Sequence, residues 1–272
     1  MASSNKTLKA RPSPDTESFI KAGNIAENYA DARIESIEDL KAQLLFAAQF
    51  RAKYDRPFIT VSYAQSIDGS IASRNNEPLE LSGPQSWTLT HQIRAVCDAI
   101  LIGIGTVLAD DPQLSVRRVD GKNPQPIILD THLRTPLDAK CVRRDDASAW
   151  LINAETNSIS DRRALEKVGA RPLACATGPD GKIDLFALMD LLAAMKINSV
   201  MVEGGARVIT SFVNARLVDQ FIITIAPKLV GGLPVLNSRG LEIAQYLECE
   251  QVHYQHLGND IIVWARPGWK TA

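Results

Sequence analysis

Two glycine turns are the first features of this sequence with a chemical use. Gly103-Ile104-Gly105-Thr106 and Glu203-Gly204-Gly205 each follow directly on a run of apolar residues. Glycine lets the backbone come close to a ligand, and the start of a helix offers free N–H groups to an anion. Open α/β sheets bind ligands at the carboxyl ends of their strands, so the two turns together predict a dinucleotide cleft. The alternative is that both turns serve packing alone, since neither matches a GxGxxG or P-loop pattern.

Three arginines supply a second candidate site. Arg94 lies late in an expected helix, and Arg117 and Arg118 follow the Asp-Asp-Pro turn at residues 110–112. The planar guanidinium group matches the geometry of a phosphate, so these residues predict a phosphorylated substrate. The alternative for each arginine is a solvated position on the surface.

Metal and nucleophile chemistry have less support. Cys249, His253 and His256 lie in an expected strand, where only Cys249 and His253 share a face, so no metal site is predicted. His91 and His132 have no serine in a GxSxG turn as a partner, so a catalytic triad is not predicted either.

The elements that must position these residues alternate between strands and helices. Strands are expected at 58–63, 99–103, 126–130, 149–152, 199–203, 221–225, about 250–256 and 261–265. Helices are expected at 37–54, from Pro84 to about Ala95, in a short stretch after Thr106, at 161–167, at 185–195 and from Gly205 to about Val218. The expected N-caps are Ser82, Thr106 and Asp184 for the second, third and fifth of these helices. This alternation predicts an α/β fold with a mostly parallel sheet and antiparallel strands at the C-terminus.

The composition limits the classes of partner. The chain has 272 residues, and its 30 basic and 31 acidic residues give a formal net charge of -1 at pH 7. That balance provides no field for nucleic acid or an anionic membrane, so neither partner is predicted. Four separated cysteines without a CxxC pair indicate reduced thiols in a cytoplasmic protein. No apolar run is long enough to span a bilayer, and the polar start is not a secretory signal; organelle targeting by that start stays an alternative.

Proline 57 marks the expected boundary between two parts of the chain, because proline stops a preceding helix. Residues 1–55 are expected to form an N-terminal extension, made of a flexible tail and an amphipathic helix. Residues 56–272 are expected to form the catalytic body.

Several motifs of this body occur in the order of one known family. They are Tyr63–Gly69, Arg94 followed by Asp98–Pro112, Ile127–Thr131, Val202–Gly205 and Ala226–Gly232. Together they resemble the riboflavin-biosynthesis pyrimidine reductases, which are the reductase domains of bacterial bifunctional deaminase-reductases and the stand-alone archaeal and fungal reductases. The resemblance implies a dihydrofolate-reductase-like three-layer fold, preceded here by the N-terminal helical extension. It also implies a homodimer that uses NADPH to reduce the ribosyl group of a ribosylaminopyrimidine 5′-phosphate to ribityl.

The resemblance also assigns roles to residues. Asp68 and Glu203 are implied to be catalytic, and the substrate is implied to contact Arg94, Leu114, Arg117 and Glu203, with the arginines on its 5′-phosphate. The cofactor is implied to contact Ala64, Thr106, Asp110, Thr131, Gly204, Gly205, Ala206, Arg207, Val208, Ile209, Thr210 and Ser211. Ser62 stands where bifunctional relatives tend to carry a lysine, which favours the stand-alone type. Two alternatives stay open: a reductase of another imine or pterin-like substrate, and a silent nucleotide-binding partner of a deaminase.

Overall fold

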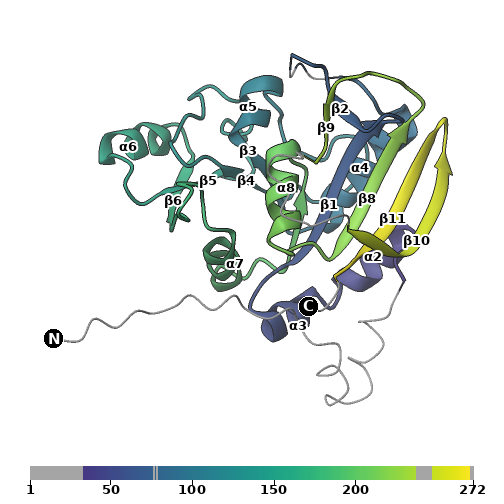
Figure 1. Cartoon of the computed structure of the whole chain (residues 1–272). Coiled ribbons are helices and arrows are strands. Elements are labelled where there is room, and N and C mark those ends of the chain that lie inside the picture. Colours follow the sequence, from purple (N-terminus) through teal and green to yellow (C-terminus); the bar gives the residue numbers. More distant parts are fainter. Residues whose placement is uncertain (1–32, 76, 78, 237–246, 270–272) are drawn as a thin grey trace. The chain divides into compact units, whose positions relative to one another are not determined.

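A single nine-stranded sheet forms the centre of the fold (Figure 1). The computed structural model describes residues 33–269 except 76, 78 and 237–246. The strand order is β10-β11-β8-β1-β7-β3-β4-β5-β6, and the strands from β8 through β6 in this order run parallel. Their bounds are β1 (Phe58–Ser66), β3 (Ala99–Gly103), β4 (Gln125–Leu129), β5 (Trp150–Ala154), β6 (Arg171–Cys175), β7 (Ser199–Val202), β8 (Gln220–Ala226), β10 (Glu248–Leu257) and β11 (Asp260–Gly268). The antiparallel β11 and β10 close one edge, which confirms the predicted mixed, mostly parallel sheet.

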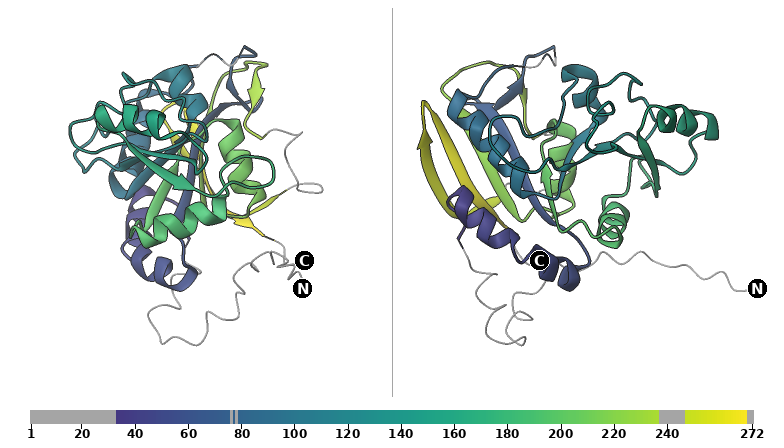
Figure 2. Two further views of the ribbon diagram at one scale, coloured as in Figure 1. Left: turned by 90° about the vertical axis from the view of Figure 1, so that its left-hand side faces the viewer. Right: turned by 180° about the vertical axis from the view of Figure 1, so that it is seen from behind.

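Helices cover both faces of the sheet, because side chains alternate between the faces along each strand. On one face, α7 (Leu185–Ala194) and α8 (Ala206–Asn214) pack on a core that includes Ile59, Val61 and Leu101. On the other face, α4 (Pro84–Val96) packs on Phe58 and Met201. Two shorter helices, α5 (Ile104–Asp110) and α6 (Ile159–Lys167), cover the part of that face that β3 and β4 form. Figures 1 and 2 show α8 and α4 on opposite sides of the sheet, so the three-layer expectation is confirmed.

The expected helix at 37–54 is two helices. Ser36 caps α2 (Ile37–Leu44), and α3 (Ala47–Tyr54) starts after a break at Leu45, which is 77% exposed. At 100° per residue, Phe50 would lie about 240° around a continuous helix from Leu44 and would miss the core. The break lets Phe50 pack against Phe58, with 5.3 Å between the ring centroids.

Both helices belong to the same compact unit as the sheet, which comprises Arg33–Trp269. The division of the chain into residues 1–55 and 56–272 therefore stays a prediction. The expected flexible tail lies outside the described residues. Within 33–269, apart from the gaps at 76, 78 and 237–246, no helix is long and apolar enough to cross a membrane.

Two predicted N-caps are wrong. Helix α4 begins after Gly83 rather than Ser82, because the buried carboxylate of Asp260 accepts hydrogen bonds from Gly83 N (2.7 Å) and Ser86 Oγ (2.6 Å). This cap comes from β11, 174 residues further along the chain, and no local pattern reveals it. Helix α5 begins after Gly103, so Thr106 lies inside its first turn instead of capping it.

Other boundaries differ by a few residues. The predicted cap of α7 is confirmed, since Asp184 accepts from Phe186 N at 2.8 Å. Helix α8 ends at Asn214 rather than near Val218. The chain leaves the helix because Arg216, two residues later, adopts a left-handed conformation (φ 53°). Strand β6 and the short antiparallel pair of β2 (Ser70–Ala72) and β9 (Leu233–Pro234) were not predicted from the sequence.

Candidate active site

The two glycine turns meet at the carboxyl edge of the parallel strands. A Cβ atom on Gly103 would lie 2.7 Å from Val208 Cγ2, and a Cβ atom on Gly204 would lie 2.8 Å from Val208 Cβ. Val208 therefore packs against both turns, and only glycine leaves room for it. Gly103 and Gly204 thus have a packing reason to be glycine, and the cofactor contact expected at Gly204 stays a prediction.

The other glycine of each turn has no such packing reason. A Cβ atom on Gly105 would meet nothing within 4 Å, and one on Gly205 would meet only Thr106 Oγ1, at 3.7 Å. Neither α5 nor α8 has a side-chain cap at its start. The bare backbone at Gly105 and Gly205 thus leaves a cradle beside the first N–H groups of α8, and an anion fits such a cradle.

The remaining predicted cofactor residues lie on several elements around this edge. Thr106 and Asp110 are one turn apart on α5, and Ala64 lies on β1 opposite Thr224 of β8. The carbonyl of Thr131, just after β4, accepts from Asn157 Nδ2 (2.7 Å). Arg207 is exposed, and Ala206 and Ser211 are half-buried on α8.

Two residues of α8 do not fit the role that the resemblance implied. Ile209 is 1% exposed and Thr210 is 5% exposed, so their side chains point into the protein and away from a pyrophosphate at the start of the helix. Contact with the pyrophosphate is accordingly proposed only for the first turn of α8.

A bidentate ion pair joins two of the predicted substrate residues. Arg94 Nε and Nη2 donate to the two carboxylate oxygens of Glu203, at 2.9 and 2.6 Å. Arg94 Nη1 donates to the carbonyl of Ser115 at 3.1 Å, and its side chain is only 6% exposed. Three of the five N–H donors of Arg94 are used in this way, so it orients Glu203 and anchors the chain at Ser115, and a direct contact with the 5′-phosphate stays a prediction.

The other arginines form an exposed basic cluster beside that pair. Arg117 Nη1 donates to Ser115 Oγ (3.1 Å), and Arg118 lies 6.0 Å from the centre of the Trp87 ring. Partial desolvation and the charges of Arg94 and Arg118 lower the pKa of Arg117. An anion in front of Arg117 would relieve this repulsion, so Arg117 fits the phosphate-binding role that the resemblance implied.

His91 contacts the backbone of this cluster. It was not predicted as a site residue. Its Nδ1 accepts a hydrogen bond from the backbone N–H of Arg117 (3.0 Å). Burial, together with the nearby charges of Arg94, Arg117 and Arg118, lowers its pKa to about 4. His91 is three residues before Arg94 on α4, so helical spacing alone places both on one face of the helix.

Asp68 is a structural carboxylate rather than a proton donor. Its oxygens accept from Ser66 Oγ (2.5 Å), Ser70 Oγ (3.1 Å), Val230 N (3.0 Å) and Gly231 N (2.6 Å). These bonds, above all that from Ser66, hold the pKa of Asp68 well below its usual range, so it is ionised at neutral pH. Asp68 thus fixes the loop at Val230 and Gly231 beside the end of β1, and the catalytic role implied for it stays a prediction, now as an ionised carboxylate.

The side chain of Leu114 is not available to a ligand. The side chain of Leu114 is 2% exposed and lies in the core with Ile100 and Ile102, so only its backbone can face a ligand. Ser62 is also buried, at 7% exposure.

Among the residues that the structure describes, no three side chains of the metal-binding types come together.

The fold and the site define a class of protein: an α/β enzyme with glycine turns and a basic cluster at the carboxyl edge of a mostly parallel sheet. The chain belongs to the RibD C-terminal domain family, whose family model matches residues 57–263. Its relatives include reductases of the riboflavin pathway, and the chain is accordingly an oxidoreductase.

Relatives and solved structures agree on this family. A 2,5-diamino-6-ribosylamino-4(3H)-pyrimidinone 5′-phosphate reductase of Methanothermobacter thermautotrophicus is 34% identical over 215 residues, which are 76% of this chain and 97% of that protein. RibD of Acinetobacter baumannii has a TM-score of 0.71 at 27% identity, and the match covers 85% of this chain and 63% of that one. The riboflavin biosynthesis reductase Rib7 of Saccharomyces cerevisiae has a TM-score of 0.63 at 27% identity, with 82% and 100% covered. The chain therefore spans less than two thirds of that RibD, but all or nearly all of the two reductases.

Proposed function

We propose that this chain reduces the ribosyl group of a ribosylaminopyrimidine 5′-phosphate to ribityl, with NADPH as the reductant. The observation that carries the proposal is the position of Glu203. It directly precedes the Gly204-Gly205 turn, and it is bonded to Arg94, which also holds the segment that carries Arg117. An anion cradle and a basic cluster thus lie on the two sides of one carboxylate, as an enzyme with two phosphorylated ligands requires.

The residues fit the cofactor that the family implies. The cradle at Gly105 and Gly205, Thr106 and the first turn of α8 would hold its pyrophosphate. Arg134, exposed and 3.9 Å from the buried Asp130, is the candidate partner for a 2′-phosphate. When bound, the nicotinamide would supply a hydride, while the chain's own task is to orient the substrate toward it.

The chemistry places few other demands on the protein. The ribosylamine ring opens to an imine, whose C1′ accepts the hydride and whose nitrogen takes a proton from water. Asp68 cannot donate that proton, because it is already ionised and holds four hydrogen bonds. Glu203 remains the proposed catalytic carboxylate, with Arg94 fixing its orientation.

A direct assay tests the proposal. NADPH oxidation is followed with the amino and the oxo (deaminated) pyrimidine phosphates side by side, and the product is identified by mass spectrometry as two hydrogens heavier. Turnover of either compound is expected. Tight NADPH binding without turnover of either would favour a reductase of another imine or pterin-like substrate. Binding of neither ligand would favour a silent partner of a deaminase.

The homodimer and the cytoplasmic location implied by the resemblance stay predictions.

Arg117→Ala tests the phosphate site. Because a charged hydrogen bond contributes about 2 kcal/mol, the variant is expected to raise KM for the pyrimidine phosphate about thirtyfold. KM for NADPH is expected to stay within about twofold. The control is Arg163→Ala, which removes an exposed guanidinium from α6. Equal losses for both ligands in Arg117→Ala would show that this arginine does not bind the substrate phosphate.

Gly105→Ala separates ligand binding from packing. A methyl group here meets no protein atom, and alanine favours the helix by about 0.5 kcal/mol, so the fold is expected to be at least as stable. The same methyl group enters the proposed cradle, so the Kd for NADPH from fluorescence titration is expected to rise about tenfold.

Gly204→Ala is the matched control, since its methyl group overlaps Val208. It is expected to lower the free energy of unfolding by about 2 kcal/mol, and Val208→Ala in the same chain is expected to recover part of the loss. Unchanged NADPH affinity in Gly105→Ala would remove α5 from the cofactor site.

A further inference from the structure

Residues 114–117, here called the 114–117 segment, lie outside any helix or strand, yet each of them is held by a side chain from elsewhere. The four hydrogen bonds run from Arg144 Nη1 to Leu114 O (2.7 Å), from Arg94 Nη1 to Ser115 O (3.1 Å), from Val116 N to Asn123 Oδ1 (2.7 Å) and from Arg117 N to His91 Nδ1 (3.0 Å). The segment that presents Arg117 is therefore fixed on both sides.

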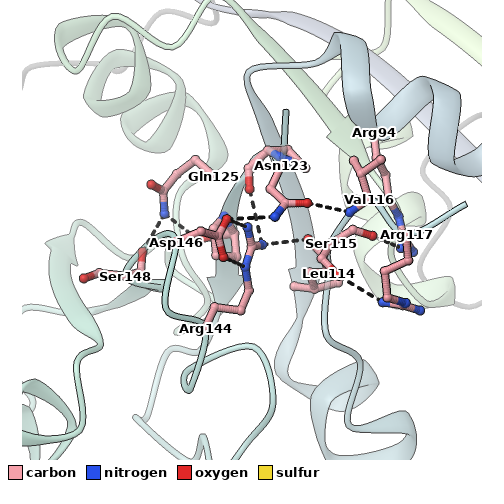
Figure 3. Close-up of polar contacts among 12 residues, drawn as sticks. Arg94, Leu114, Ser115, Val116, Arg117, Asn123, Gln125, Arg144, Asp146 and Ser148 are labelled. Carbon is pink, nitrogen blue, oxygen red and sulfur yellow. Dashed lines mark hydrogen bonds and ion pairs between the residues drawn. The ribbon is translucent and has the colours of Figure 1, made fainter. Parts of the chain in front are cut away.

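The two sides differ in origin. His91 and Arg94 come from α4 and belong to the site already described. Asn123 and Arg144 come from the loops that flank β4, and they lie on the other side of the segment (Figure 3). Neither of these two residues is next to a glycine turn or to Glu203 in the sequence, and no role was predicted for either.

Asp146 joins the two loop residues into one unit. Its carboxylate accepts from both Nε and Nη2 of Arg144 and from Asn123 Nδ2 (3.0 Å) (Figure 3). The Arg144 side chain is only 2% exposed, whereas that of Asp146 is 42% exposed. Asp146 thus aims the Arg144 guanidinium at the Leu114 carbonyl while its own charge stays in contact with water.

The segment needs this support, because its backbone is not in a conformation that it would adopt alone. Leu114 has a φ of 54°, in the left-handed region that residues with a Cβ atom rarely occupy. Its carbonyl is the one that Arg144 holds, and the direction of that peptide sets the path to Arg117 three residues later. Such strained positions persist only where the surroundings impose them.

We propose that Asn123, Arg144 and Asp146 are positioning residues for the substrate phosphate. They impose the shape of the 114–117 segment from the side opposite α4, and that shape brings the Arg117 guanidinium to the phosphate. None of the three touches the substrate. This inference rests on the proposed function and extends it to residues outside the cleft.

Asn123→Ala is the main test, because this side chain is half-buried at the rim and its loss leaves the core intact. KM for the pyrimidine phosphate is expected to rise about tenfold, with kcat and KM for NADPH within about twofold. Asn198→Ala is the matched control. It removes an amide that accepts from Arg51 (2.8 Å) at the amino end of β7, away from the site, and it is expected to leave KM for the pyrimidine phosphate unchanged.

A binding measurement keeps the test independent of turnover. Inorganic phosphate is titrated into the whole chain, and its stabilising effect is followed as a rise in Tm. The phosphate concentration that gives the same rise in Tm is expected to be about tenfold higher in Asn123→Ala than in the wild type, and unchanged in Asn198→Ala. If the wild type binds phosphate but turns over neither pyrimidine, the proposed function fails while this inference is still tested.

Two further variants complete the experiment. In the double variant Asn123→Ala/Arg117→Ala, KM for the pyrimidine phosphate is expected to be less than about twofold above that of Arg117→Ala alone, because both substitutions act on one phosphate contact. Asp146→Asn keeps the shape of the side chain but removes its charge, and it is expected to raise the same KM about threefold. Full additivity of Asn123→Ala with Arg117→Ala, or an unchanged KM in both Asn123→Ala and Asp146→Asn, would overturn the assignment.

Discussion

Arg94→Met is expected to lower the free energy of unfolding by about 3 kcal/mol and to reduce kcat/KM for the pyrimidine phosphate at least about a hundredfold. The arginine is almost fully buried, and it donates two hydrogen bonds to Glu203 and one to the Ser115 carbonyl. Methionine fills much of the same volume but leaves the carboxylate without its cation and the carbonyl without its donor. Glu203 is 22% exposed and keeps some hydration, which places the loss at the low end of the range for a broken buried pair.

A second substitution separates stability from catalysis at this pair. In Arg94→Met/Glu203→Leu no charge is left unpaired, and apolar replacements of buried ion pairs are often neutral or stabilising. The free energy of unfolding measured in urea is expected to return most of the way to the wild-type value, whereas kcat/KM is expected to stay at least about a hundredfold low because the proposed catalytic carboxylate is gone. A double variant as unstable as Arg94→Met would contradict the electrostatic cause. A double variant with wild-type activity would remove the pair from the active site.

The fold was predictable because its signals are local. The buried strands β3, β4 and β7 are short apolar runs, and each is followed by a turn or a helix start. Two of the failures share a cause, which is that a distant residue decides a local structure. Asp260 caps α4 from another strand, and the need to bring Phe50 onto Phe58 breaks the first helix. A short-range pattern contains neither contact.

The candidate site divides in the same way. The glycine turns were found from the sequence, but only the structure separates Gly103 and Gly204, which pack against Val208, from Gly105 and Gly205, which do not. The resemblance assigned Asp68 to catalysis, and only the structure shows that its four hydrogen bonds also anchor a loop. Motifs identify which residues matter, but partner atoms decide what each residue does.

The ligand of a charged residue is equally hard to predict from the sequence, as Arg94 shows. An arginine near a predicted phosphate site suggests a phosphate ligand, yet its fork is taken up by Glu203 and Ser115. The proposed phosphate contact then rests mainly on Arg117, whose guanidinium is exposed and whose backbone N–H donates to His91. The helical spacing of His91 and Arg94 offered a clue to this division, because it places both side chains on the face of α4 that supports the segment.

His91 gives the protein a specific dependence on pH. Its pKa is lowered from 6.5 to about 4 by burial and three nearby arginines, so the folded chain stays unprotonated at His91 where the unfolded chain binds a proton. The free energy of unfolding is therefore expected to fall as the pH decreases from about 6.5 to about 4, by up to about 3 kcal/mol from this residue. Above pH 6.5 the histidine is neutral in both states and contributes no slope.

His91→Asn isolates this contribution, because an asparagine Oδ1 can accept the Arg117 N–H but cannot titrate. Whatever constant loss the smaller side chain causes, the curve of stability against pH from urea unfolding is expected to be flatter than that of the wild type between pH 6.5 and pH 4. His132→Asn, which removes an exposed imidazole, is expected to keep the wild-type slope. Protonation also abolishes the acceptor that fixes the 114–117 segment, so KM for the pyrimidine phosphate is expected to rise towards pH 4 in the wild type and less so in His91→Asn. If His91→Asn followed the wild-type slope, the buried imidazole would have to be protonated in the folded chain, and the segment would need another support at Arg117.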